Sequence, residues 1–288
     1  MPILVVDDPQ DPRLADYHNV PDPILLRQRG LFVAESRLVV RTLLTHPRLH
    51  TRSLLTTRAA FASLADLLDE RQDQLPIYIA SAQLLENVVG FHVHRGCLAL
   101  GDRPHATTDT ELSPLRSARL VVVLEQVSNP DNVGSIFRNA AAFDVECILL
   151  SPQCSDPLYR KAIRTSLGAT LRIPYAVMDD WPEGLTRLRE LGYTTVALTP
   201  DASTEPLETL ATAPPPRVAI VVGTEGPGLS DAAAARVDHQ VCIPIAPGVD
   251  SLNVATATGI ALYCVSRARA QQPDGAAQGP PSASKGHG

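Results

Sequence analysis

Residues 129–143, NPDNVGSIFRNAAAF, place polar side chains inside an apolar segment. A turn followed by a helix is expected, with Asn132 at the helix entry and Arg138 one to two turns further along. Because residues three apart share a helix face, Asn132, Ser135 and Arg138 can line one edge while the alanines face a core. A guanidinium is permanently protonated and donates as a planar fork, so this edge is suited to bind an anionic group.

A second segment with unusual residues is GTEGPGLS, at 223–230. The pair at 227–228, Pro-Gly, suits a type II turn, and a plain turn is one interpretation. The other is a ligand site, because Gly223, Gly226 and Gly228 surround Glu225 just before an expected helix. Glycines let backbone amides approach a ligand closely, and the carboxylate would add an acceptor.

A third segment is IPIAPGVDSLNVATA, at 243–257, which leads into the last helix. Asp250 or Ser251 can cap that helix, and Asn253 lies in its first turn. Small residues at 255, 257, 259 and 261 indicate a tightly packed helix, against a neighbouring subunit or a loop. At its end, Arg267 and Arg269 either complement the helix dipole or have a functional role.

These segments follow strands in the second half of the chain. We predict strands at 119–124, 146–150, 172–177, 194–198, 217–222 and 240–243, and helices at 132–143, 157–167, 181–191, 229–236 and 251–269. Strands that are apolar throughout and alternate with helices predict a parallel sheet covered on both faces. Ligands of such sheets lie beyond the carboxyl ends of the strands, where the loop at 198–201 also falls.

The first half predicts a compact α/β unit of about one hundred residues. A first short helix is expected to end at Gly30, and further helices are expected at 36–44, 61–69 and 82–88. Strands are expected at 31–34, 53–56, 77–79 and 96–100. Polar, Pro- and Gly-marked residues at 101–117 predict a linker, and the patch at 208–217 predicts a loop. The composition of 271–288 predicts a disordered tail.

Composition indicates a soluble globular protein, with 44% hydrophobic and 19% charged residues in 288. No apolar run is long enough to span a bilayer, and the first residues, MPILVVDDPQD, lack a secretory pattern. Five scattered cysteines without a CxxC pair predict reduced thiols in the cytoplasm. They also have no metal-like spacing with histidine, so we expect no metal site.

Charge is uneven along the chain. The formal net charge is −6, yet residues 13–58 hold eight arginines against three acidic residues, hence +5. An acidic protein with a local basic face can still bind RNA phosphates. The helix in LYRKAIRTSLGA, at 158–169, adds Arg164, which belongs either to a solvated helix face or to a phosphate contact.

Several enzyme classes lack their signatures here. A dinucleotide-binding enzyme would carry GxGxxG after its first strand, but EQVSNPDNVG stands there with one glycine. The sequence also contains no Walker lysine motif, no HExxH and no GxSxG.

The three segments together, in this order and spacing, resemble the motifs of the SpoU (TrmH-like) RNA 2′-O-methyltransferases of the SPOUT superfamily. They are NPDNVGSIFRNAAAF, VVGTEGPGLS and IPIAPGVDSLNVATATGIALYCVSRAR. The stretches LLRQRGLFVAESRLVVRTLL and FHVHRGCLAL resemble the L30e-like RNA-binding domain that precedes this domain in the family. One departure is Ser36, where the family usually has glycine.

The resemblance implies an L30e-like α/β substrate-binding domain at 1–103, a linker at 104–117, a SpoU methyltransferase domain at 118–270 and the tail at 271–288. It also implies a trefoil knot, a homodimer formed through the C-terminal domain, and S-adenosylmethionine as cofactor. No membrane and no metal are expected.

Site residues carry over by motif position. The resemblance assigns catalysis to Asn132, Arg138, Glu225, Ser251 and Asn253. It implies that the cofactor is held by Leu198, Thr199, Gly223, Glu225, Gly226, Ile243, Ser251, Leu252 and Asn253. RNA contacts are predicted for Arg27, Arg29, Arg37, Arg138, Arg164 and Arg269.

The implied reaction is methyl transfer to a ribose 2′-hydroxyl in rRNA or tRNA. The family proposal makes the Arg138 equivalent activate that hydroxyl, but a guanidinium is already protonated. We expect Arg138 instead to position the nucleotide and stabilise developing alkoxide charge, while a phosphate oxygen or water accepts the proton. The alternative is a non-catalytic RNA-binding protein of the same fold; a Rossmann-type enzyme is disfavoured by the missing glycine pattern.

Overall fold

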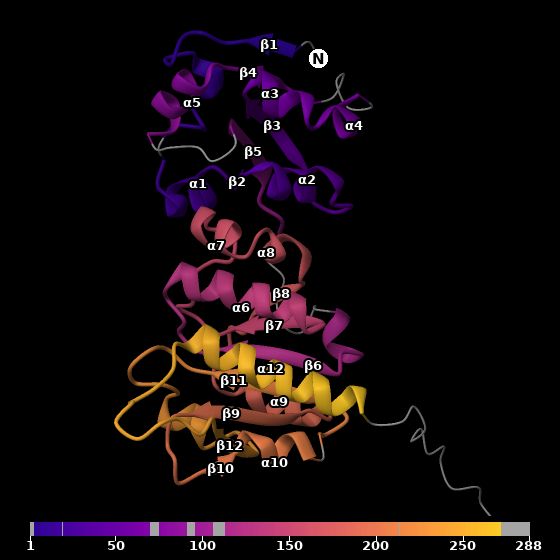
Figure 1. Cartoon of the computed structure of the whole chain (residues 1–288), viewed down its shortest axis with the longest axis vertical. Coiled ribbons are helices and arrows are strands. Elements are labelled where there is room, and N and C mark those ends of the chain that lie inside the picture. The colour runs from indigo at the N-terminus through magenta and orange to yellow at the C-terminus, as the bar shows by residue number, and fades with distance from the viewer. Residues whose placement is uncertain are drawn as a thin grey trace, which may run out of the picture.

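A computed structural model describes residues 3–18, 20–69, 75–90, 96–105, 113–212 and 214–271. Two α/β domains follow one another along the long axis of the molecule (Figure 1). The smaller one contains the N-terminal half of the chain, and the larger one contains the C-terminal half. The predicted fold class, an α/β protein with a smaller domain first, is confirmed.

A five-stranded sheet in the order β1-β4-β3-β5-β2 forms the centre of the N-terminal domain. The strands are β1 (Ile3–Val5), β2 (Leu31–Glu35), β3 (Thr51–Thr56), β4 (Ile77–Ile79) and β5 (Cys97–Asp102). A 3-10 helix at Pro12–Leu14 precedes the helices α1 (Asp22–Gln28), α2 (Arg37–Thr45), α3 (Arg58–Ala62), α4 (Ala65–Leu68) and α5 (Ala82–Val89). Separate apolar clusters lie on the two faces of this sheet.

Seven parallel strands form the C-terminal sheet, in the order β10-β12-β9-β11-β6-β7-β8. They are β6 (Leu120–Leu124), β7 (Cys147–Leu150), β8 (Tyr175–Val177), β9 (Thr194–Thr199), β10 (Glu205–Pro206), β11 (Val218–Val222) and β12 (His239–Cys242). The helices are α6 (Pro130–Ala142), α7 (Arg160–Thr165), α8 (Ala169–Arg172), α9 (Gly184–Glu190), α10 (Leu207–Thr212), α11 (Asp231–Ala234) and α12 (Val254–Ala270).

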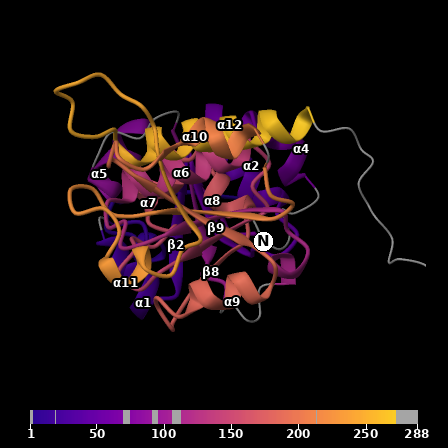
Figure 2. The same ribbon diagram turned by 90° about the horizontal axis from the view of Figure 1, so that it is seen from below.

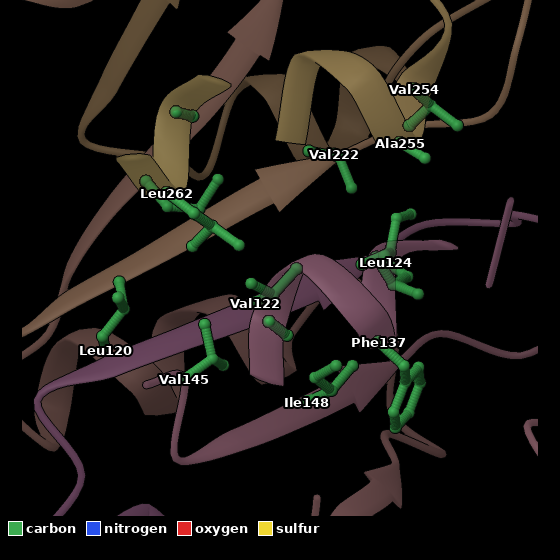
Figure 3. Packing of buried hydrophobic residues seen from close by; sticks show 14 of the residues in the cluster. Leu120, Val122, Leu124, Phe137, Val145, Ile148, Val222, Val254, Ala255 and Leu262 are labelled. Carbon is green, nitrogen blue, oxygen red and sulfur yellow. The ribbon is translucent and has the colours of Figure 1, made fainter. Parts of the chain in front are cut away.

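Helices cover both faces of this sheet, which explains why its strands are apolar throughout. Leu120, Val122 and Leu124 of β6 face a cluster that α6 and α12 complete (Figure 3). Val121 and Val123 face the opposite cluster, to which α9 and α11 contribute. Viewed from below, α6, α10 and α12 lie on one side of the strands, and α9 and α11 lie on the other (Figure 2).

The two domains share an apolar core. The cluster around β2 and α2 also contains Leu158, Ile163 and Leu171, which belong to the C-terminal half. Helices α7 and α8 lie between the two sheets (Figure 1). An ion pair between Arg103 and Asp156, at 3.0 Å, adds a polar contact across the same junction.

Ser36 keeps the turn between β2 and α2 although the family usually has glycine there. Its φ of 84° and ψ of 152° lie in a region that glycine tolerates and other residues rarely adopt. Its backbone amide donates to the carbonyl of Cys97 at 3.1 Å, and α2 begins at the next residue. The departure from the family pattern is therefore accommodated by local strain.

The structure corrects four details of the predicted elements. The loop expected at 208–217 contains most of α10, because Leu207 and Leu210 are buried on one helix face. The helix expected at 61–69 is divided into α3 and α4. The strand expected at 172–177 begins only at Tyr175, since α8 occupies Ala169–Arg172. Strand β1 was not predicted from the sequence.

Parts of the predicted boundaries lie outside the described residues. This holds for most of the predicted tail at 271–288, of which only Gln271 is described, and for 91–95 of the stretch FHVHRGCLAL that resembles the N-terminal domain of the family. Of the predicted linker, 104–105 and 113–117 are described, and Leu115 is buried in a 3-10 helix at Ser113–Arg116. No helix within the described ranges is long and apolar enough to cross a membrane.

Candidate active site

A pocket of about 320 Å³ lies beyond the carboxyl ends of β9, β11 and β12. Every residue predicted to hold the cofactor lines it: Leu198, Thr199, Gly223, Glu225, Gly226, Ile243, Ser251, Leu252 and Asn253. The other lining residues are Pro200, Val222, Thr224, Gly228, Ile245, Val254 and Ala257. Three loops far apart in the sequence therefore meet at one cavity, as parallel strands require of their carboxyl ends.

The glycine-rich loop at 223–230 doubles back on itself at the pocket wall. Gly228 donates its amide to the carbonyl of Thr224 at 3.1 Å. A Cβ atom added to Gly223 would lie 2.2 Å from the carbonyl carbon of Gly228, so no side chain fits there. Gly226 and Gly228 have φ values of 86° and 74°, which glycine adopts without strain. Turn formation and close packing both require these glycines.

Asn253 connects three segments at the pocket. Its Oδ1 caps α12 by accepting hydrogen bonds from the amides of Ala255 and Thr256, at 3.0 and 3.2 Å. Its Nδ2 donates to Oδ1 of Asn132 at 2.9 Å and to Oε1 of Glu225 at 2.7 Å. The structure thus brings together three of the residues predicted to be catalytic, and the hydrogen bonds orient all three side chains.

The other two predicted catalytic residues lie differently. Ser251 is exposed and lines the pocket. Arg138 is exposed on α6, beyond the pocket lining, and no carboxylate among the described residues forms an ion pair with it. Its guanidinium is therefore available to a group from outside this chain.

A buried carboxylate that the sequence did not single out supports the glycine-rich loop. Glu125, at the end of β6, is 2% exposed. It accepts hydrogen bonds from Nε1 of Trp181 at 2.7 Å, from the amide of Ser230 at 2.8 Å and from Oγ of Ser230 at 2.7 Å. Ser230 ends the loop that contains Glu225, so Glu125 fastens that loop to the end of β6. The only sequence signal was its place directly after a predicted strand.

The arginines predicted to contact RNA fall into different environments. Arg269 donates to the carbonyls of Arg119 and Pro215 at 2.9 and 3.2 Å, and burial, followed by the charge of Arg119, lowers its pKa. It holds chain segments together at the end of α12, away from the pocket. Arg29 is paired with Asp16 at 2.6 Å.

Three further predicted arginines, Arg27, Arg37 and Arg164, are exposed. Beside Arg164, Lys161 is paired with Asp131 of α6 at 2.7 Å, and Gly168 has a φ of 79°. The C-cap of α7 is Ser166, while Gly168 precedes α8 as its N-cap, and the exposed guanidinium of Arg164 leaves a phosphate contact open.

Metal binding finds no support in the part of the chain that the structure describes. No group of three or more histidine, cysteine, aspartate or glutamate side chains gathers there in a way that could hold a metal ion. The polar side chains that line the pocket are the amide of Asn253, the carboxylate of Glu225 and the hydroxyls of Thr199, Thr224 and Ser251.

The family model of the SpoU rRNA Methylase family matches residues 119–263. A tRNA/rRNA methyltransferase of Mycobacterium tuberculosis that is itself uncharacterized is 41% identical over 263 residues, which is 90% of each chain. The chain therefore belongs to the SpoU family of RNA methyltransferases.

Solved structures show the same fold over nearly the whole chain. An AdoMet-bound rRNA methyltransferase from Sinorhizobium meliloti superimposes with a TM-score of 0.76 at 22% identity, covering 92% of this chain and 98% of that one. An RNA 2′-O ribose methyltransferase gives a TM-score of 0.75 at 23% identity, covering 93% and 100%. The predicted family membership is confirmed, and the fold similarity includes the N-terminal domain.

Proposed function

We propose that this protein transfers a methyl group from S-adenosylmethionine to a ribose 2′-hydroxyl of tRNA or rRNA. The observation that carries the proposal is the pocket at 198–257, at whose edge Asn253 joins Asn132 and Glu225 by hydrogen bonds. Membership in the SpoU family supports RNA methyl transfer. The structural neighbour that is a 2′-O ribose methyltransferase supports the position on the sugar.

The pocket fits the cofactor in chemical terms. Leu198, Ile243 and Leu252 offer apolar contacts for a flat base, while the backbone near Gly223 can approach a ligand closely. S-adenosylmethionine would supply a methyl group bound to a positively charged sulfur. The carboxylate of Glu225 would favour that charge. Displacement at such a methyl group needs alignment more than acid–base strength, which agrees with a site built from amides.

Arg138 has the role of binding RNA in this proposal. Its exposed guanidinium can donate to a phosphate or to the 2′-oxygen and stabilise the negative charge that develops on that oxygen. Asn132 and Asn253 are oriented by their mutual hydrogen bond and limit where the nucleotide can lie. A phosphate oxygen or a water molecule accepts the proton.

Assembly and chain path are further parts of the proposal. A homodimer through the C-terminal domain is supported by Tyr263 of α12, which is 53% exposed and packs edge-on against Phe143. We also propose that the last segment forms the trefoil knot of the family, with α12 returning to pack on α6 and α10. A cytoplasmic location stays a prediction from the sequence.

Two measurements test the proposed activity. Calorimetry should detect binding of S-adenosylmethionine, and labelled methyl groups should appear on ribose when the protein acts on RNA from a strain lacking it. Failure of the purified protein to bind the cofactor at millimolar concentration would overturn the proposal. Cofactor binding without methyl transfer to any cellular RNA would favour the non-catalytic alternative.

Replacing Arg138 by Ala should lower turnover about 10²- to 10³-fold, the range for loss of one charge-stabilising donor. Cofactor affinity should stay within about twofold of the wild type, because Arg138 lies outside the pocket lining. Arg58→Ala, at an exposed arginine on α3, is the matched control and should leave turnover unchanged. Full turnover in Arg138→Ala would show that this residue has no part in the reaction.

A further inference from the structure

A second cavity, of about 500 Å³, lies at the junction of the two domains. Leu150 and Val177, at the carboxyl ends of β7 and β8, form one part of its wall. Residues of the N-terminal half, including Leu49 at the end of the α2 segment, form another. We call this cavity the arginine cleft, after the four arginines that line it: Arg27, Arg48, Arg103 and Arg172.

The charge of the arginine cleft is opposite to that of the whole chain. Four arginines and one acidic residue, Asp156, line it, so its formal charge is +3 with neutral histidines. The chain as a whole carries −6. Asp156 is paired with Arg103. Arg27, Arg48 and Arg172 are exposed, and no carboxylate in the described ranges pairs with them.

His46, which also lines the cleft, is not an additional cation. Its Nδ1 accepts hydrogen bonds from the amides of Arg48 and Leu49, at 3.2 and 3.0 Å, which requires an unprotonated Nδ1. Burial, followed by the neighbouring charge of Arg48, lowers the pKa of His46. The positive charge of the cleft therefore comes from guanidinium groups, which keep it at any accessible pH.

Like charges contributed by two domains to one cavity repel each other unless an anion lies between them. The arginines come from four separate segments, within α1, after α2, after β5 and at the end of α8, so they can contact several anionic groups at once. A guanidinium donates two parallel hydrogen bonds to a phosphate. These features suit the repeated phosphates of a nucleic acid strand better than one small anion.

We propose that the arginine cleft binds the phosphate backbone of the RNA substrate, at a site separate from the nucleotide that is methylated. This inference rests on the proposed function, which makes RNA the substrate. Of the arginines predicted from the sequence to contact RNA, only Arg27 lines the cleft. Arg48, Arg103 and Arg172 are new assignments.

The test uses the double variant Arg48→Gln, Arg172→Gln, in which both altered side chains are exposed and free of ion pairs with described residues. Fluorescently labelled tRNA and rRNA transcripts serve as probes. RNA affinity should fall about tenfold or more at low salt. The slope of log K against log salt should become shallower by roughly 1 to 2, since each lost phosphate contact contributes about 0.7 to 0.9.

Controls separate this inference from the proposed function. Arg58→Gln removes an exposed arginine that does not line the cleft, and this variant should bind RNA within about twofold of the wild type. Cofactor affinity and the thermal unfolding midpoint of the double variant should equal those of the wild type. If the double variant keeps the RNA affinity and salt slope of a wild type that methylates RNA, the proposed RNA binding by the cleft is wrong, while the proposed function stands. A wild type that binds neither cofactor nor RNA would overturn both proposals.

Discussion

Two cavities lie along the carboxyl edge of the C-terminal sheet, and the side chains that line them differ in polarity and charge. The pocket beyond β9, β11 and β12 is lined by apolar side chains, glycines and amides, with Glu225 as its acidic group. The arginine cleft beyond β7 and β8 is lined by four guanidinium groups and one carboxylate. One recognises a ligand by shape and backbone contact, and the other by charge.

This difference means that the two cavities should respond to different changes. A pocket formed by close backbone packing is sensitive to the addition of a single methyl group, and insensitive to salt. A cleft that depends on exposed charges tolerates changes of shape, but its affinity falls as ionic strength rises. Substitutions that affect one cavity without the other would establish that they act independently.

The largest effect is expected for Gly223→Ala. The added Cβ would lie 2.2 to 2.4 Å from backbone atoms of Gly228 and Leu229, so the loop has to move. Turnover should fall by about 100-fold or more, since a 1 Å misplacement of reacting groups lowers rates by about this much, and affinity for S-adenosylmethionine should fall as well. Calorimetry measures the loss, and RNA affinity of the arginine cleft should remain.

Gly226→Ala, in the same loop, provides the matched control. A Cβ on Gly226 would meet no atom within 4 Å, and only its φ of 86° opposes a side chain. The cost is then about 1–2 kcal/mol in stability, with a smaller loss of cofactor affinity than for Gly223→Ala. Equal losses in the two variants would contradict the steric explanation.

An intermediate effect is expected for Glu125→Gln. One carboxylate oxygen would become an amide nitrogen, which faces either the backbone amide of Ser230, or Nε1 of Trp181 together with the hydroxyl of Ser230. Stability should fall by about 1–3 kcal/mol, the range for a buried donor left without its acceptor. Cofactor affinity should fall as the loop at 223–230 loosens. Trp181 is the only tryptophan of the chain, so its fluorescence emission reports the loss of its hydrogen bond directly.

Glu183→Gln is the control for that variant. Glu183 lies two residues from Trp181 but is exposed and paired with Arg236 at 2.8 Å. Its removal should leave the emission and cofactor affinity unchanged, because surface ion pairs contribute little. A Glu125→Gln protein with wild-type emission, stability and cofactor affinity would show that the carboxylate does not hold Trp181 and the loop in place.

The smallest effect concerns pH and the arginine cleft. Burial lowers the pKa of His46 below its usual value near 6.5, so the folded state binds the proton less readily than the unfolded state. The stability that neutral His46 contributes is present above pH 6.5 and is lost as pH falls through the lowered pKa. The free energy of unfolding should fall more between pH 7 and pH 5 for the wild type than for His46→Asn. The asparagine side chain keeps a hydrogen-bond acceptor but does not titrate. Equal losses would indicate that His46 is not the group responsible.

Much of the pocket was predictable because its residues are local signals. Glycines before a helix, and Asn253 at a helix entry, indicate loops at strand ends, and parallel strands bring such loops together. The resemblance to the SpoU motifs then singled out the residues that line the cavity. The hydrogen bond between Asn253 and Asn132 joins residues 121 positions apart; the motif pattern assigned both residues to the site but did not predict the bond.

The remaining features depend on packing between distant segments, which no local pattern records. Glu125 meets Ser230 and Trp181 because the ends of β6 and α11 adjoin in the folded sheet. Arg269 was predicted to contact RNA, and no sequence pattern indicated that the segment at 215–216 also gives its guanidinium carbonyl partners. Helix α10 was not predicted because the threonine, alanine and proline residues at 208–217 are typical of a loop. The helical spacing of the two buried leucines, Leu207 and Leu210, was too short a pattern to outweigh them.

The apolar core that crosses the domain junction has a consequence for substrate choice. Leu158, Ile163 and Leu171 would be exposed to water if the domains swung apart, and burying side chains of this size contributes about 1.5–3 kcal/mol each. The separation between the arginine cleft and the cofactor pocket is therefore held constant by packing. An RNA would be selected by whether its own folded length spans that interval, so a molecule with the right nucleotide at the wrong distance from its anchoring strand would not be modified.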